Sequence, residues 1–111
     1  MNSRIGREQL KGHLNLLLLA VLSRGPAHGY DVITALRAVS DGEFDLSEGT
    51  VYPALHRLEA SGLLCSDWST HGGRRRRTYE ITQDGEASLA VQEQAWRRFT
   101  YGVSNVLASY A

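Results

Sequence analysis

The sequence is poor in residues that many small secreted or metal-bound domains depend on. It has one cysteine, Cys65, so an internal disulfide is excluded and no cysteine cluster is available for a metal. The longest apolar segment, Leu14 to Leu22, contains Asn15 and is shorter than the roughly 18 residues that a membrane span needs. Residues Met1 to Arg7 lack the apolar core of a secretory signal. We therefore expect a soluble, cytoplasmic protein.

Signatures of catalysis are also missing. The sequence has neither a Gly-x-Ser-x-Gly elbow nor a phosphate-binding loop, and its four histidines stand apart, without metal-ligand spacing. We therefore expect that the protein is not an enzyme and needs no cofactor or metal. At 111 residues the chain makes one domain with a modest core, and such domains often gain stability by pairing with a second copy.

The most informative feature that is present is a run of four arginines, Arg74 to Arg77, directly after Gly72 and Gly73. The run lies between two segments that read as strands, Leu63 to Ser69 and Thr78 to Ile81. Like charges side by side repel one another, so an external anion is the expected partner. The alternative is a solvated charge run that pairs with the acidic loop from Ser40 to Leu46.

The charge of the chain is local, because the net charge is zero. Residues 31–48 carry five acids and one arginine, whereas residues 49–79 carry five arginines and two acids. A focused basic face can steer a neutral protein toward phosphate, with less long-range attraction than a wholly basic protein has. Strand alternation would point Arg75 and Arg77 to one side and Arg74 and Arg76 to the other.

Apolar spacing predicts three helices before this hairpin, at about 9–23, 28–39 and 47–61. In the third, a rotation of about 100° per residue places the apolar residues on one face and small or polar residues on the opposite face. Pro53 favours a start nearer Thr50. A helix followed by a basic hairpin is typical of a winged helix-turn-helix. The candidates for contacts to a DNA groove are Thr50, Tyr52, His56 and Arg57.

Each of these candidates has a plainer interpretation. Tyr52 could be a half-buried core residue, and His56 a solvated helix residue. Arg57 could pair with Glu59 or with the acidic loop. Thr50 is the candidate best suited to a phosphate contact.

After Thr82, which we expect to cap a last helix, apolar residues follow a heptad-like pattern. This helix has roughly three heptads, so we expect it to pack against a second chain. The alternative is that it folds back over the first helix. The predicted dimer contacts are Leu14, Leu18, Leu89, Trp96, Phe99, Val103 and Val106.

Several segments resemble the PadR family of winged helix-turn-helix transcriptional regulators, and the resemblance covers nearly the whole chain. Its most specific part is a Thr-Val-Tyr-Pro-x-Leu-x-x-Leu-Glu block followed by the arginine hairpin and Thr-x-x-Gly. The single last helix resembles the shorter branch of the family, and Thr78 departs from the family's usual second tyrosine. The matching segments are Leu10–Leu14, Gly25–Tyr30, Glu48–Glu59, Gly62–Leu64 and Arg76–Gly85.

The resemblance implies a homodimeric repressor that binds a palindromic operator in double-stranded DNA and is released by an effector. It implies a winged DNA-binding domain at 1–81, whose helix 9–23 also meets the partner, and a dimerisation helix at 82–111. In the short branch, flat aromatic effectors enter a cleft at the dimer axis, which here would involve Trp96 and Phe99. The alternative function is a winged-helix protein–protein interaction module without DNA binding.

Overall fold

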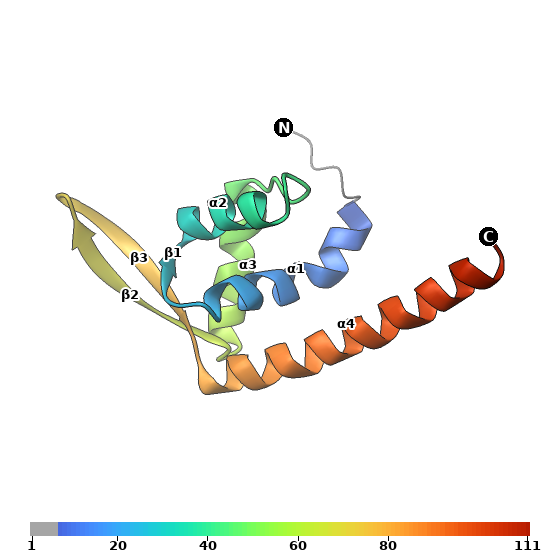
Figure 1. Ribbon diagram of the computed structural model, residues 1–111. Coiled ribbons are helices and arrows are strands. Elements are labelled where there is room, and N and C mark those ends of the chain that lie inside the picture. Colours follow the sequence, from blue (N-terminus) through green and yellow to red (C-terminus); the bar gives the residue numbers. More distant parts are fainter. Residues whose placement is uncertain (1–6) are drawn as a thin grey trace.

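The computed structural model describes residues 7–111, so the first six residues of the expected domain 1–81 lie outside the described part. Four helices and a small antiparallel sheet confirm the mainly helical winged architecture (Figure 1). In chain order the elements are α1 (Arg7–Leu22), β1 (Ala27–His28), α2 (Gly29–Val39), α3 (Glu48–Ala60), β2 (Leu64–His71), β3 (Arg74–Ile81) and α4 (Gln83–Ser109).

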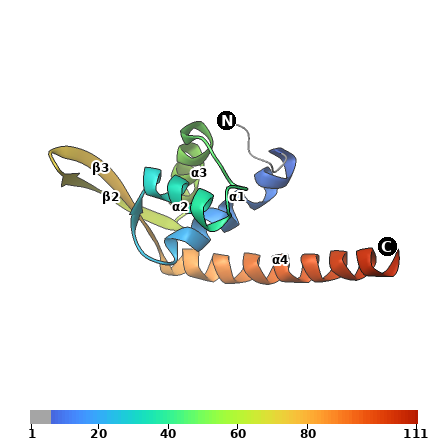
Figure 2. The ribbon, with the colours of Figure 1, turned by 45° about the horizontal axis from the view of Figure 1, so that its top comes forward.

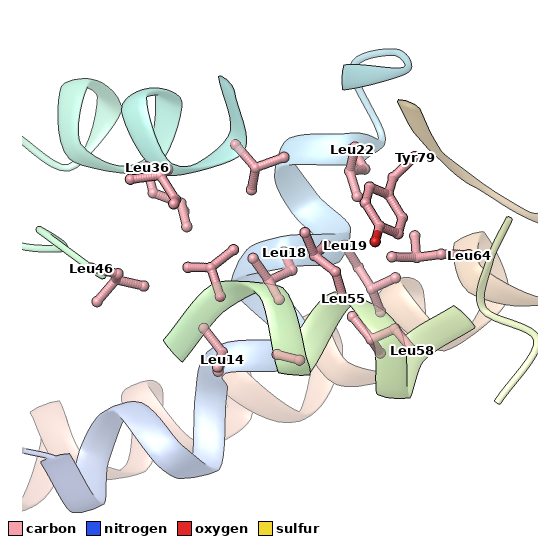
Figure 3. Packing of buried hydrophobic residues seen from close by; sticks show 14 residues of the cluster. Leu14, Leu18, Leu19, Leu22, Leu36, Leu46, Leu55, Leu58, Leu64 and Tyr79 are labelled. Carbon is pink, nitrogen blue, oxygen red and sulfur yellow. The ribbon is translucent and has the colours of Figure 1, made fainter. Parts of the chain in front are cut away.

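The hydrophobic core lies where α1, α2, α3 and the base of the sheet meet (Figure 3). Leucines of the apolar stripe on α1 pack against Leu55 and Leu58 of α3, with Leu64 and Tyr79 closing the side toward the sheet. Most apolar positions of the three predicted helical stripes are buried, as their 3.6-residue spacing required. Tyr30, at the start of α2, has an exposed side chain.

The sheet has the order β1-β3-β2, and both pairings are antiparallel. β2 and β3 extend to His71 and Arg74, further than predicted, so the arginine run belongs to a strand and only two glycines form the turn. Gly72 and Gly73 have φ values of +57° and +79°. Two consecutive left-handed residues are what a tight two-residue hairpin turn requires, and glycine adopts this conformation without steric cost.

Helix α3 begins at Glu48, and the expected start nearer Thr50 is wrong. Ser47 is the residue before the helix, with extended backbone, but its side chain makes no capping hydrogen bond. Pro53 is therefore inside the helix, where it cannot donate to the carbonyl of Gly49. Both residues are exposed, so water can satisfy the free carbonyl and the helix continues.

The start of α4 is joined closely to the end of α3 and the start of β2. The Thr82 hydroxyl accepts a hydrogen bond from the Gly85 amide at 3.0 Å and donates one to the Gly62 carbonyl at 2.7 Å. The Thr82 amide also donates to the Leu63 carbonyl at 3.1 Å. Thr82 is thus the predicted cap, and it also fixes the direction in which α4 leaves the sheet.

From this joint, α4 runs past α1, and its second half extends beyond the rest of the chain (Figures 1 and 2). The first half packs on α1, where the His13 and Trp96 rings meet edge to face with centroids 4.8 Å apart. The second half leaves Val103, Val106 and Leu107 exposed. The alternative arrangement, in which the last helix folds back over α1, therefore applies only to the first half of α4.

Candidate nucleic-acid interface

Helix α3 presents one face to solvent, as its sequence predicted. Val51, Leu55 and Leu58 are buried on the inner face. Thr50 and Tyr52 are half-buried at the two flanks. The outer face is small at its start and polar further on, and it consists of the exposed residues Gly49, Pro53, His56, Arg57 and Ala60.

A groove of about 730 Å³ lies between the start of α2, the face of α3 and the hairpin β2–β3, which we call the wing. Positive charge is supplied by the wing, and aromatic rings come from all three elements. The residues that line the groove are His28, Gly29, Tyr30, Glu48, Tyr52, His56, Trp68, Arg74, Arg75, Arg76, Arg77 and Tyr79.

The groove brings together most of the residues that the sequence singled out. Tyr52 and His56 of α3 and all four wing arginines line it. Thr50 and Arg57 do not, because they lie on other sides of α3. The Thr50 hydroxyl is 3.1 Å from the Ser47 hydroxyl, whereas the Arg57 side chain is exposed.

Arg77 is tied to α3 and differs from the other wing arginines. Its Nε donates to the Ser66 hydroxyl at 2.8 Å, and its Nη2 lies 3.6 Å from Glu59 Oε1. The Ser66 hydroxyl in turn donates to Glu59 Oε2 at 2.7 Å. This network occupies Glu59, and the alternative in which Arg57 pairs with Glu59 is not observed. It also fixes the angle between the wing and the end of α3.

The remaining wing arginines are free of anionic partners. Arg74, Arg75 and Arg76 are exposed, and none of them forms an ion pair within residues 7–111. Asp45 of the acidic loop pairs with Arg37 of α2 at 3.7 Å. The tip of the wing projects away from that loop in both ribbon views, so pairing of the two is not observed (Figures 1 and 2).

Tyr52 is held against the first residue of α2 by a close approach that requires glycine. A Cβ at Gly29 would lie 2.5 Å from Cε1 of the Tyr52 ring. Partial burial raises the pKa of the Tyr52 phenol above its ordinary value near 10, and the nearby Glu48 and Tyr30 raise it further. The hydroxyl therefore stays protonated at neutral pH, where it can donate a hydrogen bond to a phosphate or a base.

Tyr79, at the floor of the groove, has a raised pKa as well. Burial is the main cause of the raised pKa. The positive charge of Arg77 lowers this pKa, while Glu59 and Tyr52 raise it by smaller amounts. Tyr79 is almost completely buried in the core, and its ring centroid is 6.5 Å from that of His56. The floor of the groove is thus uncharged, and its cations lie on the wing.

The sequence did not point to the other six residues that line the groove. They are His28, Gly29, Tyr30, Glu48, Trp68 and Tyr79. Their shared location depends on how α2 and the wing pack beside α3, and no local sequence signal reports that packing.

A second hollow, of about 290 Å³, lies between α1 and α4. Both predicted effector-binding residues line it, with the Trp96 and Phe99 rings 6.2 Å apart, and both are exposed. The hollow also includes His13, whose Nδ1 donates to the Gln9 carbonyl at 2.7 Å. The lining residues are Gly12, His13, Leu16, Gln92, Ala95, Trp96 and Phe99.

Two residues that we predicted at a dimer interface lie in the core of the single chain. Leu14 is 7% exposed and Leu18 is 0% exposed, so neither has surface left for a partner, and that prediction is wrong. Leu89 packs partly against the same core. Cys65 is exposed on β2.

The structure offers neither a clustered metal-ligand set nor a membrane-spanning helix within residues 7–111. Within residues 7–111, no group of three or more His, Cys, Asp or Glu side chains is arranged to hold a metal ion. None of the helices α1 to α4 is both long and apolar enough to cross a membrane.

Known proteins share this architecture. The model of the "Transcriptional regulator PadR-like family" matches residues 18–91. A PadR family transcriptional regulator from Eggerthella lenta has a TM-score of 0.77 and 34% identity, over 90% of this chain and 86% of that one. A PadR-like transcriptional regulator from Bacillus cereus has a TM-score of 0.79 and 31% identity, over 90% and 96% of the two chains.

Two curated relatives match over part of their length. The transcriptional regulator Rv3488 of Mycobacterium tuberculosis is 48% identical over 52 residues, which are 47% of this chain and 49% of the relative. The transcriptional regulator YqjI of Escherichia coli is 37% identical over 90 residues, which are 79% of this chain and 37% of the relative. This chain thus matches about half or less of the length of each.

A helix with an exposed polar face beside a basic two-stranded wing defines a winged helix-turn-helix protein of the DNA-binding class. The family match covers well over half of the chain, and the solved relatives share its fold over 90% of its length. The chain belongs to the PadR-like family of transcriptional regulators. The family is one of transcriptional regulators and not of enzymes, as the resemblance implied.

Proposed function

We propose that this protein is a homodimeric transcriptional repressor that binds a palindromic operator in double-stranded DNA. The observation that carries the proposal is the groove in which the exposed face of α3 meets three wing arginines without anionic partners. In this proposal α3 enters the major groove, and the wing holds the adjacent backbone. Arg74, Arg75 and Arg76 contact phosphates, since guanidinium groups pair well with phosphate oxygens.

In this proposal some residues of α3 contact base edges, and others contact phosphates and so position the helix in the groove. His56 and Arg57 point outward and supply donors to base edges, and a bidentate arginine–guanine contact discriminates by roughly 1–3 kcal/mol. Thr50 and Tyr52, at the flanks, hold phosphates through their hydroxyls. Arg77 stays bound to Glu59 and supports the wing without reading DNA.

Pairing through α4 is the second part of the proposal. An apolar stripe along the second half of this helix is exposed in the single chain, and exposed apolar surface of this kind marks an interaction site. Exposed positions on one side of α4 are spaced by three, four and seven residues, as in a two-stranded seam. They are Trp96, Phe99, Val103, Val106 and Tyr110, and the exposed Leu107 is next to Val106 in the sequence.

In this arrangement residues up to 81 form the DNA-binding domain and residues 82–111 the dimerisation helix. The hollow beside Trp96 and Phe99 then lies next to the seam, and we propose that a flat aromatic effector binds there. Aromatic walls favour a flat aromatic ligand through stacking. Binding next to the seam would change the distance between the two recognition helices and release the DNA.

The test is selection of bound sequences from a random duplex pool, with oligomeric state measured at the same protein concentration. We expect a palindrome whose half-sites are about one helical turn, or 10 base pairs, apart. A protein that stays monomeric, or that enriches no duplex in dilute salt, would refute the proposal. Capture of a protein in place of DNA would favour the interaction-module alternative.

Paired variants assign the residues. Arg74→Ala with Arg75→Ala should weaken binding to all duplexes alike and lower the slope of log affinity against log salt by about 0.9 per lost phosphate contact. Arg97→Ala with Arg98→Ala, which removes the same charge from α4, is the matched control and should leave the slope unchanged. Arg57→Ala should instead alter sequence preference.

A further inference from the structure

Trp68 is a large aromatic residue in an exposed place. It is on β2, opposite Arg77 of β3, and its side chain remains 54% exposed. The guanidinium carbon of Arg75 lies 4.8 Å from its ring centroid, and that of Arg77 lies 5.2 Å away. Both distances are within the range of a cation–π contact. One ring therefore meets two of the four wing arginines, both on the same face of the hairpin.

The two arginines depend on this ring to different degrees. Arg77 is also bound by Ser66 and Glu59, so it is ordered without Trp68. Arg75 forms no ion pair or side-chain hydrogen bond within residues 7–111, and the ring is its one ordering contact there. A free arginine side chain has large rotamer entropy, which it loses when it binds phosphate.

We propose that Trp68 is a positioning residue of the wing, which orders Arg75 over the groove before DNA binds. The inference rests on the proposed DNA-binding function and adds a residue that acts through another. Stacking occupies the flat face of the guanidinium and leaves its N–H edge free to donate to a phosphate. Part of the ordering cost is then met in the free protein, so Trp68 raises affinity without contacting DNA itself.

The size of the effect follows from the strength of an exposed cation–π contact. Such a contact corresponds to a factor of about 2–5 in an equilibrium constant. If both wings of a dimer engage the duplex independently, the factors multiply to about 4–25. Removing the ring should therefore weaken binding by this factor, with little change in the thermal stability of the fold, because Trp68 is largely exposed.

The experiment measures binding of a labelled mixed-sequence duplex of about 30 base pairs by fluorescence anisotropy over a salt series. Trp68→Leu keeps apolar bulk but removes the aromatic face, and we expect weaker binding with an unchanged salt slope. Trp68→Tyr restores a stacking face and should recover most of the affinity. Because Tyr is a conservative change, it also keeps the test decisive if the Leu variant does not fold.

A double-mutant cycle separates positioning from direct contact. With Arg75→Ala, the loss caused by Trp68→Leu should largely disappear, because the residue through which Trp68 acts is gone. Arg76 is on the opposite face of β3, so Arg76→Ala is the matched control, and its effect should add to that of Trp68→Leu.

The outcomes distinguish the two proposals. If the unmodified protein binds no duplex in dilute salt, the proposed function fails. If it binds and Trp68→Leu binds equally well, the positioning role is overturned while DNA binding stands. Additive effects of Trp68→Leu and Arg75→Ala, or a salt slope that falls as far in Trp68→Leu as in Arg75→Ala, would overturn it as well.

Discussion

Replacing Gly85 with alanine tests the joint that directs α4. Gly85 lies in the first turn of α4 and is buried. A Cβ there would lie 2.1 Å from the Leu63 carbonyl oxygen and 2.7 Å from Cγ1 of Ile81. The shortest ordinary carbon–oxygen contacts are about 3.3 Å, so the backbones must separate by about 1 Å. The Leu63 carbonyl cannot swing aside, because it accepts the hydrogen bond of the Thr82 amide.

Two effects of opposite sign decide the stability of Gly85→Ala. Alanine is favoured over glycine inside a helix by about 0.8–1 kcal/mol, which would stabilise α4. Overpacking costs about 1–3 kcal/mol, and more where the obstacle is backbone. We expect the clash to win, with a net loss of about 1–2 kcal/mol and a melting temperature lower by roughly 5–15 °C.

Thermal unfolding followed by circular dichroism at one fixed protein concentration measures this effect, because the stability of a dimer depends on concentration. Gly102→Ala is the matched control in the same helix, since a Cβ there meets nothing within 4 Å in the chain. It should stabilise by up to about 1 kcal/mol. If Gly85→Ala is as stable as Gly102→Ala, the close approach does not constrain α4 and the reasoning is wrong.

Two further predictions concern Tyr52. In Gly29→Ala the new Cβ displaces the Tyr52 ring, which can move because it is only half-buried. We therefore expect weaker DNA binding, measured by anisotropy, with little change in the melting temperature. Unchanged affinity would count against the Tyr52 contact. The raised pKa values of Tyr52 and Tyr79 mean that the folded state binds their protons more tightly than the unfolded state. The free energy of unfolding should therefore decrease as pH rises above about 10, measured by urea denaturation. The decrease should be smaller in Tyr52→Phe and unaltered in the exposed control Tyr101→Phe.

Periodic patterns were the most dependable guide to this fold. The helical spacing of α3 correctly assigned Val51, Leu55 and Leu58 to the inner face and His56 and Arg57 to the outer face. Such patterns succeed because a side chain's direction follows from its position in a regular helix or strand. The same rule placed Arg75 and Arg77 on one face of the wing, where both meet Trp68.

Predictions failed where a neighbouring element changes the outcome of a local rule. Pro53 suggested a later start for α3, but its lost hydrogen bond faces solvent and costs little there. The spacing of Leu14 and Leu18 fits a dimer interface as well as a hydrophobic core. Only the packing of α2 and α3 against α1 shows that both side chains lie in the core.

The sequence by itself determined the order of the four helices and the two wing strands, though not the short strand β1, together with the inner and outer faces of α3 and the family resemblance. Each of these depends on residues near one another in the chain. Only the tertiary structure decided that Arg77 supports the wing through Glu59 while Arg75 rests on Trp68, and that Gly29 and Gly85 are sites of close approach. These are contacts between separate elements, and a side chain's partners there depend on how the elements pack in space.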